Sequence, residues 1–169
     1  MTRFRKNKKW FLIKDFYKET TGFCSAAALA NACVVIEYLY MYSVVNETIA
    51  ATAMKVPAET VEKGADERAI LKGLRKLGFK SFPRRTDTKR FKVLSSKDFA
   101  VALHWLTVGY VVIAIIRENS HWAVITMDDY GKIILIDADN TCPMLTKLSH
   151  IELEREWRIN GLFYGIGVK

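Results

Sequence analysis

The hydrophobic pattern of this chain changes its period near the middle, and this change limits the folds that the chain can adopt. The first half repeats apolar residues at helical spacing, whereas the second half contains dense β-branched runs. Helices are predicted at residues 24–42, 47–53, 66–77, 96–106 and 152–157. Strands are predicted at residues 110–116, 122–127, 132–136 and 161–168. Helices followed by strands predict an α+β fold with a C-terminal antiparallel sheet, not alternating βαβ units.

The strongest turn signal lies between the predicted strands 122–127 and 132–136, where the sequence reads Asp128-Asp129-Tyr130-Gly131. A short polar turn between two such runs predicts an antiparallel hairpin. The end of the second strand should then lie beside the start of the first. No internal repeat, low-complexity segment or Pro-rich linker divides the chain. We therefore expect a single domain over residues 1–169, preceded by a basic N-terminal segment at residues 1–15.

The composition fits a globular protein with one sizeable core. The chain has 169 residues, of which 50% are hydrophobic and 26% are charged. Its three cysteines form no CxxC pair, no cluster of metal ligands and no disulfide framework of a small secreted domain. We expect reduced thiols in a cytoplasmic protein with neither a metal nor a cofactor. The oligomeric state has no signature in the sequence.

Two segments resemble membrane or export signals at first sight. The basic N-terminus precedes an apolar run at residues 10–13, but Lys14 ends this run and no small-residue cleavage site follows, so no secretory signal is predicted. Residues 23–42 are almost continuously apolar, but they include Asn31 and Glu37. A spanning helix needs about 20 residues with few or no charges. We predict instead a helix buried in the core and no membrane span.

The formal net charge of +8 is concentrated in two stretches. Residues 3–18 contain seven Lys or Arg against one acidic residue, and residues 72–97 contain ten against one. The favoured interpretation is a solvated basic surface. An acidic protein partner, an anionic membrane or nucleic acid is the alternative.

Cys24 is a candidate nucleophile because it lies at the start of the predicted Ala-rich helix, just after the polar residues 20–22. At a helix N-terminus the unpaired backbone N–H groups and the helix dipole stabilise a thiolate. The same N–H groups can face the oxyanion that forms when a thiolate attacks a carbonyl. A free cysteine is more often a small buried hydrophobe. That interpretation is favoured for Cys33, and Cys142 is expected to be incidental.

A nucleophilic cysteine needs a base, and the chain offers three histidines. His121 follows a polar turn and opens a predicted strand, so it can lie at the mouth of the sheet. His104 lies inside a helical pattern, and His150 precedes an acidic segment with no strand to hold it. We therefore predict that His121 is the base.

The third member of a triad accepts a hydrogen bond from the imidazole and holds its orientation. Asp137 ends the strand that pairs with the strand of His121, so hairpin topology makes the two residues neighbours. Asp139 and Asn140 are close enough along the chain to take this role instead. Asp128 and Asp129 lie at the opposite end of the hairpin and are assigned to the turn.

The order of these residues resembles a known family. Cys24 lies at a helix start, His121-Trp122 opens a strand about a hundred residues later, and Asp137 follows the next strand. This order is similar to that of the double-glycine peptidase domain of bacteriocin-exporting transporters and its stand-alone relatives. The resemblance runs from about residue 16 to residue 168. It implies a papain-like fold in which the nucleophile helix packs against an antiparallel sheet.

Two further segments carry the resemblance, namely residues 64–67, which lead into a middle helix, and residues 95–109, which precede the central strand. The family implies a hydrolase that cleaves a peptide or amide bond of a peptide or protein substrate through a thioester. Members usually place a glutamine six residues before the cysteine to complete the oxyanion hole, and Lys18 stands there in this chain. Ser25 stands where members usually have glycine. Lys18 or Thr21 is expected to help hold the oxyanion.

Two other interpretations stay open. A deamidase or transglutaminase uses the same order of Cys, His and Asp for acyl transfer on a protein. Replacement of the usual glutamine by Lys18 would also suit a catalytically degenerate module that only binds peptides.

Overall fold

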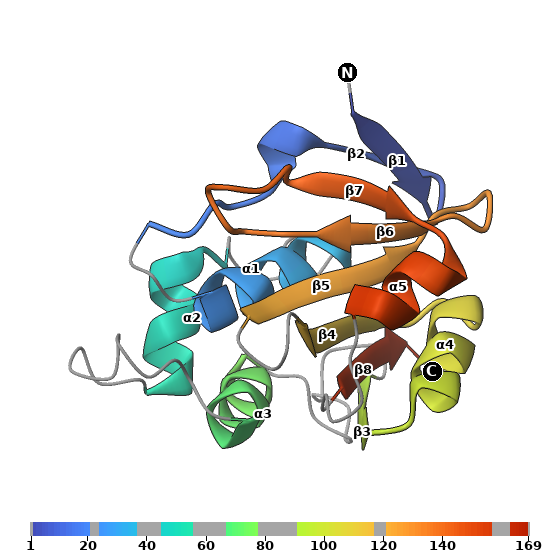
Figure 1. Cartoon of the computed structure of the whole chain (residues 1–169). Coiled ribbons are helices and arrows are strands. Elements are labelled where there is room, and N and C mark those ends of the chain that lie inside the picture. Colours follow the sequence, from blue (N-terminus) through green and yellow to red (C-terminus); the bar gives the residue numbers. More distant parts are fainter. Residues whose placement is uncertain are drawn as a thin grey trace.

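A six-stranded antiparallel sheet forms the centre of the molecule (Figure 1). The computed structural model describes residues 2–20, 24–36, 45–55, 67–77, 91–116, 121–156 and 163–168. The strands of this sheet are β3 (Phe91–Ser96), β4 (Val111–Ile116), β5 (His121–Met127), β6 (Ile133–Ile136), β7 (Leu145–Leu148) and β8 (Phe163–Val168). Their order across the sheet is β3-β8-β4-β5-β6-β7, and every neighbouring pair is antiparallel. The last strand of the chain therefore lies between β3 and β4.

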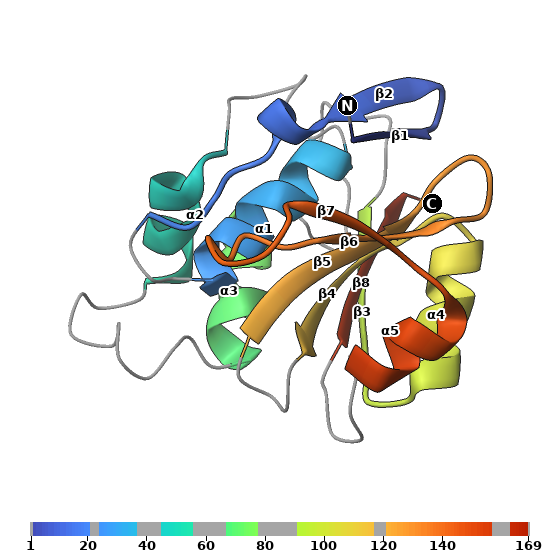
Figure 2. The same ribbon diagram turned by 45° about the horizontal axis from the view of Figure 1, so that its top comes forward.

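Helices cover both faces of the sheet. Figure 2 shows three helices on one side, namely α1 (Cys24–Val35), α2 (Glu47–Met54) and α3 (Glu67–Lys76). On the other side lie α4 (Phe99–Thr107) and α5 (His150–Glu156). The predicted α+β class is confirmed. A sheet covered on both faces buries both sets of alternating side chains, which explains why the sequence of β4 to β6 is apolar almost throughout.

The alternation along β4 shows the two cores directly. Val111 and Ile113 pack in the core that contains α1, whereas Val112 and Ala114 pack in the second core with α4 and α5. The same division continues in β5 and β6. Alternate side chains of one strand thus fix both helical layers to the sheet.

The helix α1 is buried along almost its whole length, from residue 25 to residue 35. Its many alanines let α1 approach β4 and β5 closely, and Gly73 of α3 fits against Leu29 of α1 in the same way. The prediction of a core helix is confirmed for this part. Residues 37–42 of the predicted helix lie outside the described residues. Among the helices that the structure describes, none has both the length and the apolar character needed to span a bilayer.

The N-terminal basic segment is folded, and the prediction of a solvated basic surface is wrong for Lys6, which is buried. The segment forms a hairpin of β1 (Arg3–Lys6) and β2 (Lys9–Leu12), followed by a short 3₁₀ turn, η1 (Ile13–Asp15). The aromatic rings of Phe4, Phe11 and Phe16 stack on one another and join the core of α1. The alternation within each strand places Phe4 and Phe11 inward.

Two local features differ from the sequence predictions. The helix predicted at residues 96–106 begins at Phe99, because Ser96 belongs to β3 and Asp98 caps α4 by accepting a hydrogen bond from the backbone N–H of Ala100 at 2.8 Å. The strand β7 lies where no strand is predicted, because its polar alternate residues hide the pattern. Residue 66, where the third helix is predicted to begin, lies outside the described residues.

The predicted turn at residues 128–131 is confirmed and has a second role. The carboxylate of Asp128 accepts hydrogen bonds from the backbone of Tyr130 and Lys132, and Gly131 has a φ of +76°. Asp129 accepts from the backbone N–H groups of Asn7 and Lys8 at 2.8 and 3.2 Å. The turn therefore holds the N-terminal hairpin against the sheet.

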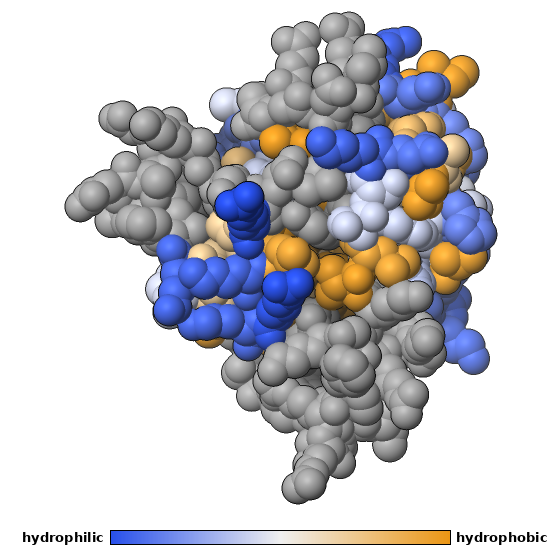
Figure 3. All heavy atoms as spheres, turned by 90° about the horizontal axis from the view of Figure 1, so that it is seen from below, coloured by the Kyte–Doolittle hydropathy of each residue, from blue (hydrophilic) through white to orange (hydrophobic). Residues whose placement is uncertain are grey.

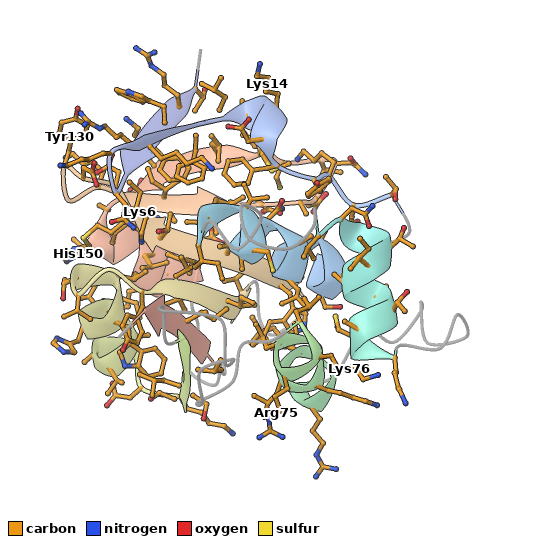
Figure 4. The ribbon with its side chains drawn as sticks, turned by 180° about the vertical axis from the view of Figure 1, so that it is seen from behind. Lys6, Lys14, Arg75, Lys76, Tyr130 and His150 are labelled. Carbon is orange, nitrogen blue, oxygen red and sulfur yellow. The ribbon has the colours of Figure 1, made fainter. Side chains whose placement is uncertain are left out.

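The second basic stretch is described only in part. Lys72, Arg75 and Lys76 of α3 are exposed, and Figure 3 shows a hydrophilic patch over this helix beside a band of apolar surface. Figure 4 shows Arg75 and Lys76 pointing away from the body of the molecule. Residues 78–90 lie outside the described residues.

Candidate active site

Cys24 is the first residue of α1, and its side chain is half-buried. The chain just before the helix is held by Asn31, which is fully buried in the middle of α1. Asn31 accepts a hydrogen bond from the backbone N–H of Tyr17 at 2.8 Å and donates one to the backbone oxygen of Tyr17 at 3.0 Å. This paired contact holds Tyr17, and with it the segment that leads to Glu19, against α1.

His121 and Asp137 meet as the hairpin topology predicts. His121 is the first residue of β5, and Asp137 is the first residue after β6. The register pairs Val124 with Ile136, which brings the two ends together. The imidazole Nε2 lies 2.7 Å from Asp137 Oδ1, and the two residues are 8% and 1% exposed.

The carboxylate of Asp137 is fixed by the backbone that follows it. Its Oδ1 also accepts from the N–H of Asp139 at 2.9 Å, and the N–H of Asp137 donates to the backbone oxygen of Met144 at 2.9 Å. The alternatives Asp139 and Asn140 are engaged elsewhere. Asp139 accepts from Thr141, and Asn140 donates to the backbone oxygen of Glu19.

The charge state of His121 follows from its partners. Burial alone lowers the pKa of an imidazole, but hydrogen bonds with Asp137 and with the Cys24 side chain outweigh burial here. Together with the charges of the same two groups, they raise the pKa of His121 from 6.5 to about 10. At neutral pH His121 is therefore an imidazolium beside the Cys24 side chain.

Glu19 also reaches this site, although no pattern in the sequence indicates such a role. One donor atom each of Glu19, Cys24 and His121 lies within 4.8 Å of the other two. Because Nε2 of His121 faces Asp137, Nδ1 is the ring nitrogen left for the other two groups. The roles of Glu19 and Asn31 depend on how the segment before Cys24 packs against the rest of the fold, including the loop after β6, and local sequence does not show this packing.

Lys18 lies beside the site with its ammonium group turned toward the loop after β6. Its Nζ donates to the backbone oxygens of Asp137 at 3.3 Å, of Cys142 at 2.7 Å and of Asp139. An ammonium has three protons, and three carbonyl oxygens surround this one. To donate to an oxyanion, Lys18 would have to leave these carbonyls. Thr21 lies outside the described residues.

The remaining cysteines and histidines lie away from this arrangement. Cys33 is fully buried in α1, and burial raises the pKa of its thiol well above the usual range. Cys142 is half-buried in the loop after β6. His104 and His150 are both exposed, on α4 and at the start of α5. The structure thus brings together the one cysteine and the one histidine that the sequence selected.

Comparison with known proteins gives one informative result. No family model and no curated protein sequence matches this chain. Among solved structures, it is similar to a double glycine motif protease from an AMS/PCAT transporter, solved in complex with the leader peptide. The TM-score is 0.52 over 89% of each chain, at 16% sequence identity. The likeness is one of fold. A peptidase-like α+β fold is therefore established for this chain.

Proposed function

We propose that this chain is a cysteine hydrolase that cleaves a peptide or amide bond with Cys24 as nucleophile, His121 as base and Asp137 as the residue that orients His121. The observation that carries the proposal is the 2.7 Å contact between His121 Nε2 and Asp137 Oδ1. The opposite edge of the imidazole ring is turned to Cys24. Likeness in fold to a protease solved with a leader peptide supports a peptide as the substrate.

The first half of the proposed reaction is acylation. The proton of the Cys24 thiol passes to His121 Nδ1, and the thiolate attacks the substrate carbonyl carbon. Backbone N–H groups at the start of α1 hold the negative oxygen of the tetrahedral intermediate. As this intermediate collapses, His121 returns its proton to the leaving amine. The products of this step are a free amine and a thioester on Cys24.

The second half is hydrolysis of the thioester. His121 takes a proton from water, the resulting hydroxide adds to the thioester carbonyl, and a second tetrahedral intermediate forms. Its collapse expels the Cys24 thiolate and releases the carboxylic acid. Asp137 holds the imidazole ring through both halves and stabilises its charged form without taking the proton itself. Thr21 is proposed as a further oxyanion contact, and Lys18 as one that must first release a carbonyl oxygen of the loop after β6.

A mapped reaction with iodoacetamide at neutral pH tests the nucleophile without any knowledge of the substrate. We expect Cys24 to be alkylated at least about tenfold faster in the parent than in His121→Ala, since the imidazolium stabilises the thiolate. A Cys142→Ser background removes the other half-buried thiol, and Cys33 serves as an internal buried reference. Equal alkylation of Cys24 with and without His121 would contradict the assignment.

The reaction type needs a separate measurement, because deamidation and cleavage share the thioester. Incubation with a mixed peptide library should yield new peptide termini, detected by mass spectrometry, that are missing with Cys24→Ala. Release of ammonia from glutamine side chains without new termini would favour a deamidase. Peptide binding that Cys24→Ala leaves intact, with no product of either kind, would favour a binding module.

A further inference from the structure

We propose that Glu19, Cys24 and His121 form a zinc-binding site, and that bound zinc keeps the nucleophile from reacting. One donor atom of each residue lies within 4.8 Å of the other two. The donor set contains sulfur, nitrogen and oxygen, all of which Zn²⁺ accepts in proteins. Around a tetrahedral zinc with bonds of about 2.0–2.3 Å, neighbouring ligand atoms are roughly 3.5 Å apart. Side-chain movements of about an ångström therefore suffice to close the site.

The orientation of His121 suits a metal ligand. Its Nε2 faces Oδ1 of Asp137 at 2.7 Å, so Nδ1 is the nitrogen presented to Cys24 and Glu19. Metal-binding histidines commonly donate their second ring N–H to a carboxylate, which fixes the ring and makes the bound nitrogen more basic. Asp137 is 1% exposed and is itself held by the N–H of Asp139. The same contact that serves the proposed triad would thus support the metal.

Glu19 is held in place by its backbone and is not a freely swinging surface residue. Its N–H donates to the backbone oxygen of Ala138 at 3.0 Å, and its backbone oxygen accepts from Asn140 Nδ2 at 2.9 Å. Two residues earlier, Tyr17 is bound on both sides by Asn31. These contacts fix the backbone of Glu19 beside the loop that also supplies Asp137. The third ligand therefore starts from a backbone that is already in place.

The charges of the site also match a divalent cation. Zinc would displace the proton of His121, and a thiolate, a carboxylate and a neutral imidazole then carry two negative charges between them, which balance Zn²⁺. Three protein ligands leave the fourth tetrahedral position for water. Zinc draws electron density from a bound sulfur and blocks one side of it, so the bound thiolate attacks a carbonyl much more slowly than the free one. Because Cys24 is the nucleophile of the proposed hydrolase, the inhibitory part of this inference rests on the proposed function, whereas the binding part does not.

Binding is tested by isothermal titration of the reduced, metal-free chain with zinc chloride. We expect one zinc ion per chain and an affinity at least about tenfold weaker in Glu19→Gln, which keeps the size of the side chain but removes its charge. Glu154→Gln, an exposed carboxylate on α5, is the matched control and should bind zinc as the parent does. Unchanged affinity in Glu19→Gln, or no binding by the parent, would overturn the site.

A spectroscopic measurement identifies the sulfur ligand independently of activity. Cobalt(II) in place of zinc should give a thiolate-to-cobalt charge-transfer band in the parent and in Cys142→Ser. Cys24→Ser should lose this band, and circular dichroism of each variant shows whether it is folded. A band that persists in Cys24→Ser would place the metal elsewhere and overturn the proposal.

Protection from alkylation separates this inference from the proposed function. If zinc binds at Cys24, one equivalent should slow the reaction of Cys24 with iodoacetamide at least about tenfold, and a chelator should restore it. Rapid alkylation that zinc leaves unchanged would overturn the zinc site while supporting the reactive nucleophile. Zinc binding and protection in a chain that processes no peptide would uphold the site and count against the hydrolase. Faster peptide cleavage with zinc bound would overturn the inhibitory role.

Discussion

At the scale of single residues, the site depends on buried polar groups that neighbouring segments hold in place. Asp137 is held by the backbone of Asp139 and by that of Met144, and its Oδ1 meets the imidazole of His121. Asn31 plays the same part for the segment before Cys24, because its amide binds the backbone N–H and oxygen of Tyr17. These two buried side chains therefore both have partners, as burial demands.

Replacing Asp137 by Asn should change the titration of His121 and the reactivity of Cys24 together. The raised pKa of His121 means that its protonated form stabilises the fold fully below pH 6.5, and that this contribution is lost as the pH rises toward about 10. In Asp137→Asn we expect a lower pKa by NMR titration, a flatter fall in stability over that window, and alkylation of Cys24 slowed by about tenfold or more.

The control for this change is Asp139→Asn. The carboxylate of Asp139 accepts from the backbone N–H and the hydroxyl of Thr141, so its loss should leave the pKa of His121 close to the parent value. An unaltered titration of His121 in Asp137→Asn would show that Asp137 does not govern its charge.

At the scale of elements, close packing of small residues sets the position of the nucleophile helix. Gly73 of α3 faces α1 and α2, and a Cβ built there would lie 2.6 Å from Met54 Cγ and 2.7 Å from Leu29 Cδ2. Real Cβ atoms essentially never come so close to another heavy atom. The three helices can therefore meet at this spacing only because residue 73 has no side chain.

We predict that Gly73→Ala destabilises the fold despite the better helix propensity of alanine. The propensity gain is about 1 kcal/mol, whereas overpacking a well-filled core costs typically about 1–3 kcal/mol. Urea unfolding should show a net loss of up to roughly 2 kcal/mol. The exposed neighbour Lys72→Ala should stay within about 0.5 kcal/mol of the parent. A stabilised Gly73→Ala would mean that α3 can shift away at little cost.

At the scale of the whole molecule, the N-terminal hairpin and the sheet are joined through a buried charge. Lys6 is 4% exposed, and its Nζ donates to Thr126 Oγ1 of β5 at 2.6 Å. Figure 4 shows Lys6 reaching from the hairpin toward the sheet. Burial lowers the pKa of Lys6 from 10.5 to about 8, although the nearby charge of Asp129 acts in the opposite direction.

Because the folded pKa of Lys6 is below the unfolded value, the buried ammonium costs stability below about pH 8, and this cost disappears as the pH rises toward 10.5. We expect Lys6→Met to be more stable than the parent at pH 7 by about 1–3 kcal/mol, and this advantage to shrink by pH 10. Urea unfolding of both proteins at the two pH values measures the difference, in which other titrating groups cancel.

Lys14→Met is the matched control, because Lys14 is exposed on the turn after the hairpin. Its stability relative to the parent should not depend on pH over this range. A Lys6→Met advantage that stays constant from pH 7 to pH 10 would contradict the lowered pKa.

The sequence alone determined those features that are set by neighbours along the chain. Local periodicity gave the α+β class, and the helix start marked Cys24. The turn at residues 128–131 was enough to make Asp137 a neighbour of His121, because a hairpin pairs strand ends whatever surrounds it.

Only the tertiary structure decided what lies around that pair. Lys18 meets the oxygen of Asp139 across 121 residues, and Lys6 meets Thr126 across 120. Glu19 joins Cys24 and His121 in the same way. A lysine or glutamate in a charged segment has the same local pattern whether it faces solvent or a carbonyl, so its role is fixed only by which distant segment packs against it.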